Sequence, residues 1–240
     1  LIAAYKISII ISNNILLAVI SPVLLIPYFF DAFYYQTSFL FTEWWGLFFF
    51  ILGLAALLYD KKNATITFFS LSVLSRELFL IPILTMTLVS LLFKTNRLIF
   101  LKILLIFMLF YSIHFLNVQK QNIVPAARVP WARIHPFSWL QLQREIAFSM
   151  RQYPLLKFRL PILWVSLTTT ALILQILKNR KSKYHLTMFA YLACSFAPLM
   201  VLTPFFGVIY NDYWGILFMP LVIMLSPAFL LISKNHNLSA

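Results

Sequence analysis

Long apolar runs, broken only by short charged clusters, limit most strongly what this chain can fold into. Eight such runs cover approximately residues 9–30, 44–59, 63–75, 78–93, 98–116, 160–177, 184–209 and 213–232. Charged residues make up 10% of the chain and hydrophobic residues 62%, whereas a soluble domain usually carries about 25% charged residues. A chain of this kind cannot cover a water-facing surface with polar groups. The sequence therefore predicts an all-α, polytopic transmembrane helical bundle that forms one domain over residues 1–240.

Residues 63–93 are the ambiguous part of this pattern, because an Arg-Glu pair at 76–77 divides them. A Lys pair at 61–62 precedes the region, and a basic cluster at 94–102 follows it. Cytoplasmic loops of membrane proteins carry an excess of Lys and Arg. Both flanks are therefore expected in the cytoplasm, which a single crossing cannot achieve. The charges predict a helical hairpin with its tip at the Arg-Glu pair on the outer side.

The same rule extends to the whole chain and predicts about eight crossings with a cytoplasmic C-terminus. The chain is expected to be a multi-pass integral membrane protein, with the bacterial inner membrane as its predicted location. Nineteen Lys and Arg against six Asp and Glu give a formal net charge of +13. Topology accounts for the Lys-rich cytoplasmic loops, so nucleic acid is not an expected partner, whereas membrane lipids are. The acids gather on the predicted outer side, as do most Arg residues: Asp31, Glu43, Glu77, Glu145, Asp212, Arg76, Arg128, Arg133, Arg144, Arg151 and Arg159.

The outer loop at 117–159 is too polar to cross a membrane and contains a helix signal at 138–153. Ser138 is a good N-cap, and Gln141 stands where it completes a capping box. Apolar side chains then recur at three- and four-residue spacing: Trp139, Leu142, Ile146, Met150 and Tyr153. This spacing predicts an interfacial amphipathic helix whose apolar face contacts acyl chains. The helix either forms one wall of an outer site or only plugs the loop.

Motifs of soluble enzymes are absent from the sequence. It contains no zinc-protease, nucleophile-elbow, Walker or dinucleotide-binding signature. The single cysteine, Cys194, excludes an intrachain disulfide and a cysteine-based metal cluster. No cofactor or metal site is predicted, although a divalent metal remains open. In the outer loop, Arg133 and His135 are candidate substrate-binding residues. His135 is also a candidate acid/base group, because an imidazole titrates near neutral pH.

The segment "FTEWWGLFFFILGLAALLYDKKNATITFFSLSVLSRELFLIPIL" at 41–84 has a distinctive order. An acid stands at the outer start of a helix, and a basic cytoplasmic turn follows. One short helix then rises to an outer Arg and another returns. This order resembles the polyprenyl-phosphate-sugar-dependent glycosyltransferases of the GT-C fold class, which include lipid A aminoarabinose transferase and protein O-mannosyltransferase relatives.

The resemblance implies a sugar transfer from a lipid-linked donor to an acceptor on the outer (periplasmic or luminal) face. Glu43 takes the family's acid position, and Arg76 takes the hairpin-tip position near the lipid-linked phosphate. Glu77 would orient Arg76 or cap the returning helix, and Asp212 lies where the family has its last outer loop. The main catalytic acid of the family lies in its first outer loop, so we expect it upstream of Leu1. Within the chain, Asp31 is the substitute.

Three other interpretations of the sequence remain. An O-antigen polymerase or ligase also joins sugars at the outer face and uses Arg-rich loops. A transporter would use short paired apolar segments as broken helices around a midplane site, with the Arg76–Glu77 pair buried. A membrane component without enzymatic activity is the last alternative.

Overall fold

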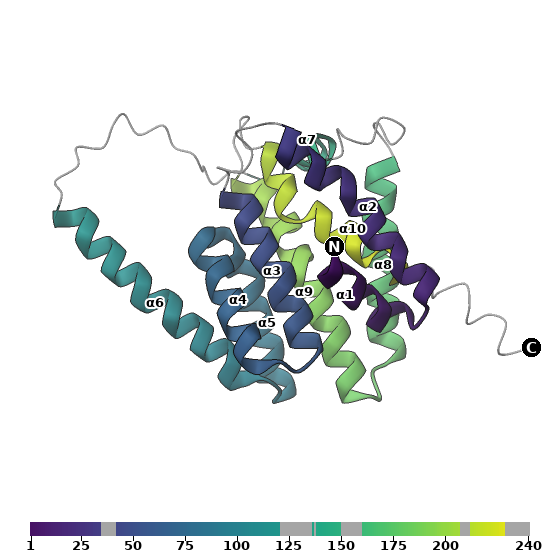
Figure 1. Cartoon of the computed structure of the whole chain (residues 1–240), viewed down its shortest axis with the longest axis horizontal. Coiled ribbons are helices and arrows are strands. Elements are labelled where there is room, and N and C mark those ends of the chain that lie inside the picture. The colour runs from purple at the N-terminus through teal and green to yellow at the C-terminus, as the bar shows by residue number, and fades with distance from the viewer. Residues whose placement is uncertain (35–41, 121–135, 137, 150–159, 207–211, 229–240) are drawn as a thin grey trace, which may run out of the picture.

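Helices form all the regular structure of the residues that the computed structural model describes, which are 1–34, 42–120, 136, 138–149, 160–206 and 212–228 (Figure 1). The elements in chain order are α1 (Ile2–Ser12), α2 (Ile15–Tyr34), α3 (Thr42–Leu58), α4 (Lys62–Ser75), η2 (Glu77–Phe79), α5 (Leu80–Phe93), α6 (Arg97–Lys120), α7 (Trp139–Ser149), α8 (Leu160–Lys178), α9 (Lys183–Phe206), η4 (Asp212–Leu217) and α10 (Met219–Leu225), where η marks a 3₁₀-helix. The all-α prediction is confirmed for these residues.

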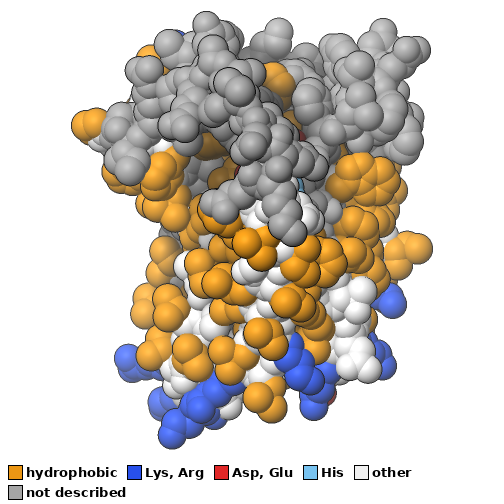
Figure 2. Space-filling model, turned by 90° about the vertical axis from the view of Figure 1, so that its left-hand side faces the viewer, with side chains coloured by type: hydrophobic (Ala, Val, Ile, Leu, Met, Phe, Trp, Pro, Cys, Tyr) orange, Lys and Arg blue, Asp and Glu red, His pale blue; other side chains and the backbone are white. Residues whose placement is uncertain are grey.

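Six of the eight apolar runs correspond to single helices, namely α3, α4, α5, α6, α8 and α9. The turns that join α3 to α4, α5 to α6 and α8 to α9 lie at the same end of the bundle (Figure 1). Figure 2 shows Lys and Arg side chains along this lower end, beneath a wide band of hydrophobic side chains. We call it the basic end. The turn between α4 and α5, together with α7 and η4, lies at the opposite end (Figure 1).

The helical hairpin predicted at 63–93 is present. Helices α4 and α5 have 14 residues each, and Arg76 separates α4 from η2 with an extended backbone (φ −150°, ψ 112°). The hairpin packs on α3 through Phe50, whose ring centroid lies 5.1 Å from the rings of both Phe69 and Phe79. Gly53 makes room for this stack, because a Cβ atom there would lie 2.6 Å from the Phe69 ring.

The predicted run at 9–30 is two helices rather than one. Asn13 adopts a left-handed conformation (φ 46°) that ends α1. The side-chain oxygen of Asn14 then accepts hydrogen bonds from the backbone N–H groups of Leu16 (2.9 Å) and Leu17 (3.2 Å). This is an N-cap, and it begins α2 in a new direction. Local capping by the Asn pair therefore overrides the continuous apolar pattern.

The last run, 213–232, also differs from a simple membrane helix in its described part. It begins as η4 and continues as α10, whose seven residues are all buried and which contacts α1, α2, α8 and α9. The hydroxyls of Ser8 (3.1 Å) and Ser21 (2.8 Å) donate to the Met224 carbonyl oxygen. Both α1 and α2 are thereby joined to the last turn of α10 in the interior of the bundle.

In the described part of the chain, two helices are long and apolar enough to cross a membrane, over Arg97–Asn117 and Lys183–Phe206. Helix α6 leans away from the bundle (Figure 1), and large apolar side chains on its second half, such as Leu109 and Phe110, are exposed. Length and composition therefore indicate membrane association. The arrangement of eight crossings stays a prediction.

Candidate functional site

A buried ion pair joins α3 to the tip of the α4–α5 hairpin. Glu43 lies in the first turn of α3, and its Oε1 atom is 2.9 Å from Nη2 of Arg76. Only 8% of Arg76 is exposed, and Glu43 is buried as well. Glu77 lies farther away, with its Oε1 atom 3.7 Å from Nη1 of Arg76, and its side chain is 54% exposed. Arg76 was expected to be an exposed tip, but the exposed charge of the tip is Glu77.

Close packing of α3 against α4 brings the two charges together. The Ser72 hydroxyl donates to the Gly46 carbonyl oxygen over 2.7 Å. A Cβ atom on Gly46 would lie 3.0 Å from Cβ of Arg76 and 2.7 Å from the Phe79 ring. Residue 46 therefore has to be small for the hairpin tip to reach the beginning of α3.

An apolar cavity of about 510 Å³ lies along α3, and neither Glu43 nor Arg76 lines it. Trp44, next to Glu43 in the chain, lines it together with Leu47 and Ile51 on successive turns of the same helix. The first turn of α1 and Leu25 of α2 form the other walls. The cavity therefore begins one residue after Glu43 and continues along α3 toward Ile51.

A second buried acid lies on α7, where the sequence predicted a surface helix. Glu145 is 0% exposed. Its Oε1 atom accepts a hydrogen bond from Nε2 of Gln141 (3.2 Å), and its Oε2 atom accepts one from the Thr203 hydroxyl of α9 (2.7 Å). The sequence analysis placed Glu145 among the acids of the outer side and did not predict its burial or its partners. An acid four residues after a Gln is too common a pattern to reveal a buried network.

The helix predicted at 138–153 is confirmed over Trp139–Ser149, but its orientation is not. The capping prediction is met in part, since the Gln141 N–H donates to the Ser138 hydroxyl oxygen over 3.2 Å. Leu142 and Ile146 were expected to contact acyl chains, yet both are buried in the bundle. The reason is that Gly215 of η4 lies directly against the backbone of α7, so the helix packs on protein. Met150 and Tyr153 lie outside the described residues.

The structure describes the remaining predicted site residues in part or not at all. Asp31 lies near the end of α2 and Asp212 begins η4, but the structure describes only their backbone. Arg133 and His135 lie outside the described residues. The structure thus brings together Glu43, Arg76 and Glu77 of the predicted set. In the described part of the chain, no group of three or more His, Cys, Asp or Glu side chains is placed to hold a metal ion.

Comparison with known proteins adds no further assignment. No protein family, curated protein or solved structure matches the chain.

Proposed function

We propose that this chain is a membrane glycosyltransferase that moves a sugar from a polyprenyl-phosphate-linked donor to an acceptor on the outer face. The observation that supports it best is the buried Glu43–Arg76 pair at the α4–α5 turn, opposite the basic end, together with the apolar cavity that begins at Trp44 on the same helix as Glu43. A lipid-linked donor has the same two parts, a phosphate at the membrane surface and a long apolar chain below it.

The chemistry of the step assigns a role to each group. Transfer breaks the bond between the sugar and the donor phosphate oxygen, and that phosphate leaves with added negative charge. A guanidinium stabilises such charge well, because it presents five N–H donors in a planar fork that matches phosphate oxygens. Arg76 would provide this charge, and Glu43 would hold the guanidinium in place. The apolar cavity would take the first isoprenoid units of the donor.

The acceptor hydroxyl needs a carboxylate within hydrogen-bond reach to remove its proton. Glu77 is exposed beside Arg76 and would face the aqueous side of the site. Asp31 and Asp212 stay candidates as second acids on the same side. We propose Asp31 as the base, with Glu43 as a positioning residue.

A membrane transporter is the second candidate, and one observation favours it. The chain breaks at Asn13–Asn14 between α1 and α2, and serines of both helices bind the carbonyl oxygen of Met224. Transporters place interrupted helices of this kind around a site at mid-membrane. On this reading the Glu43–Arg76 pair would be part of a gate.

Sugar transfer in proteoliposomes distinguishes the two functions. The full-length protein would be supplied with a polyprenyl-phosphate-linked sugar and an outer acceptor, and product would be measured. Arg76→Lys keeps the charge but loses the planar fork, so transfer should fall about tenfold or more. Arg76→Gln combined with Glu43→Gln leaves no buried charge without a counter-ion, so the protein should fold yet lose transfer.

Lys62→Gln, at the basic end, is the matched control and should transfer sugar normally. Near-normal transfer by the double variant, with a melting temperature like that of the wild type, would show that the pair is only structural. Movement of a labelled solute across the membrane by wild-type protein that transfers no sugar would support the transporter instead.

A further inference from the structure

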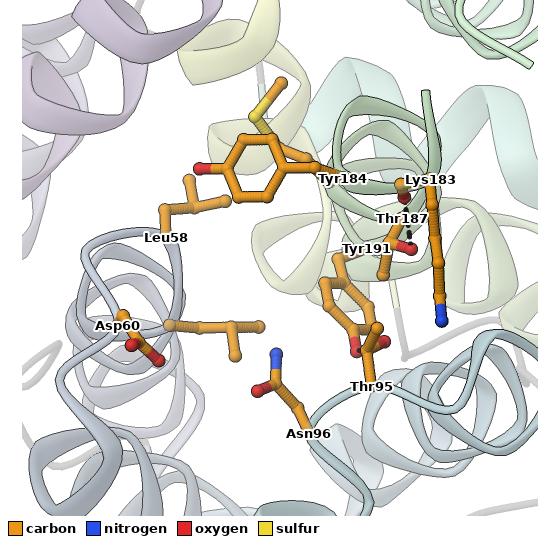
Figure 3. Close-up of a pocket in the computed structure, with 10 residues that line it drawn as sticks. Leu58, Asp60, Thr95, Asn96, Lys183, Tyr184, Thr187 and Tyr191 are labelled. Atoms are coloured by element: carbon orange, nitrogen blue, oxygen red, sulfur yellow. Dashed lines mark hydrogen bonds between the residues drawn. The ribbon is translucent and has the colours of Figure 1, made fainter. Parts of the chain in front are cut away.

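A second cavity, of about 570 Å³, opens at the basic end of the bundle (Figure 3). It lies between the end of α3, the turn from α5 to α6 and the beginning of α9. Its lining combines apolar side chains, among them Leu57, Leu58 and Met188, with polar ones, among them Asp60, Asn96 and Lys183. The volume is in the range of about 300–1,000 Å³ that is typical of small-molecule sites.

Hydrogen bonds fix the walls of this cavity before any ligand arrives. The Tyr191 hydroxyl lies 2.8 Å from the Ser90 hydroxyl oxygen and 3.2 Å from the Thr95 hydroxyl oxygen, which ties α9 to α5 and the following turn. The Thr187 hydroxyl donates to the Lys183 carbonyl oxygen over 2.7 Å. Asn96 has a positive φ of 52°, and its side chain points into the space (Figure 3).

Opposite charges stand on two sides of the cavity. In Figure 3, the Asp60 carboxylate lies across the open space from the Lys183 ammonium, and the Asn96 amide lies between them. No ion pair joins Asp60 to Lys183 among the described contacts. A ligand that carries both a cation and an anion would complement these two opposite charges. The apolar part of the lining would meet a hydrocarbon portion of the same ligand.

We propose that this cavity binds the head group of phosphatidylethanolamine. The ethanolamine ammonium would donate hydrogen bonds to Asp60, and the phosphate would accept them from Lys183 and Asn96. The upper acyl carbons would lie on Leu57, Leu58 and Met188. This inference shares the membrane setting of the proposed function, but it concerns the opposite end of the bundle and none of the transfer chemistry.

The charges favour this lipid over its relatives. Phosphatidylglycerol has the same phosphate but no ammonium, so the Asp60 carboxylate would have no cationic partner in that lipid. Phosphatidylcholine has the same phosphate, but its quaternary ammonium has no N–H to donate. The specificity would therefore depend on Asp60, and the affinity common to all phospholipids would depend on Lys183.

Native mass spectrometry of the full-length protein in mild detergent would test the site. The protein would be titrated with dioleoyl phosphatidylethanolamine, phosphatidylcholine and phosphatidylglycerol. Wild-type protein should bind the ethanolamine lipid about tenfold more tightly than the other two, as one charge-assisted hydrogen bond allows. Asp60→Asn should abolish this preference. Asn also tolerates the positive φ of 53° at this position, so the turn should keep its shape.

Two lysine variants complete the test. Lys183→Gln should weaken binding of all three lipids, whereas Lys181→Gln, two residues earlier in the turn before α9 and outside the cavity, should change nothing. Equal binding of the ethanolamine and choline lipids by the wild type would overturn the proposal. A preference that survives Asp60→Asn would overturn it as well. If the wild-type protein shows no lipid preference but transfers sugar normally, the lipid site is refuted and the proposed function stands. If alkaline carbonate removes the wild-type protein from membranes, it is not an integral membrane protein, and both the lipid site and the proposed function are refuted.

Discussion

Arg76 and Glu43 occupy a site in which neither charge is stable alone. Both side chains are buried and their charged atoms lie 2.9 Å apart. Removing one partner of a buried pair leaves an uncompensated charge, which costs about 3–5 kcal/mol. Neutralising both together avoids most of that cost. The pair therefore contributes more to where the hairpin tip sits than to the total free energy of unfolding.

A double-mutant cycle would measure this coupling. We expect Arg76→Gln alone to lower the free energy of unfolding by about 3–5 kcal/mol, and Glu43→Gln added to it to restore most of the loss. Thermal unfolding in detergent gives the measurement. Glu77→Gln is the control, since a pair with an exposed partner contributes roughly 0–1 kcal/mol. Additive effects of the Arg76 and Glu43 substitutions would contradict the pairing.

The sequence pointed to Glu43 and Arg76 separately, through the order of charges along 41–84, but not to their contact. Glu77 is adjacent to Arg76 in the chain and is the obvious partner by sequence. Its side chain turns to solvent because the extended backbone at Arg76 directs the two side chains differently. Only the approach of α3 at Gly46 makes Glu43 the closer acid, and such an approach depends on packing between distant segments.

The amphipathic pattern of α7 predicted the helix correctly but not what its apolar face contacts. Its apolar face was expected to contact lipid, but Leu142 and Ile146 contact protein. Ile146→Asp should therefore destabilise the whole bundle, because a carboxylate would be buried without a partner. Ala147→Asp, on the exposed side of the same helix, should be tolerated. Thermal unfolding of both variants checks this, and equal melting temperatures would mean that α7 is not packed on the bundle.

Apolar run length predicted helices α3 to α6, α8 and α9 closely, because each run ends where charges begin. It did not predict the break between α1 and α2, since Asn13 and Asn14 change the mean apolarity of the run very little. It did not predict the burial of α10 either. A run that is hydrophobic on all sides is equally suited to lipid and to a protein interior.

The unequal distribution of charge between the two ends of the bundle predicts its orientation in a membrane. A cysteine at Glu77 or Arg144, both exposed, should react with a membrane-impermeant thiol reagent added from outside. A cysteine at Lys61 or Lys181, at the basic end, should react only after the membrane is permeabilised. Cys194 would be replaced first. Labelling of Lys61 from outside in intact cells would reverse the assigned orientation.

The shortness of the α4–α5 hairpin has a consequence for the surrounding lipid. Fourteen residues at 1.5 Å per residue span about 21 Å, whereas the hydrocarbon layer is about 30 Å thick. If the basic turns stay at the cytoplasmic surface, Arg76 lies several ångströms below the opposite one. A short membrane segment is accommodated when the bilayer thins around it. The outer leaflet would then form a dimple over the hairpin, and a lipid-linked phosphate entering it would leave the plane of its neighbours to reach the protein.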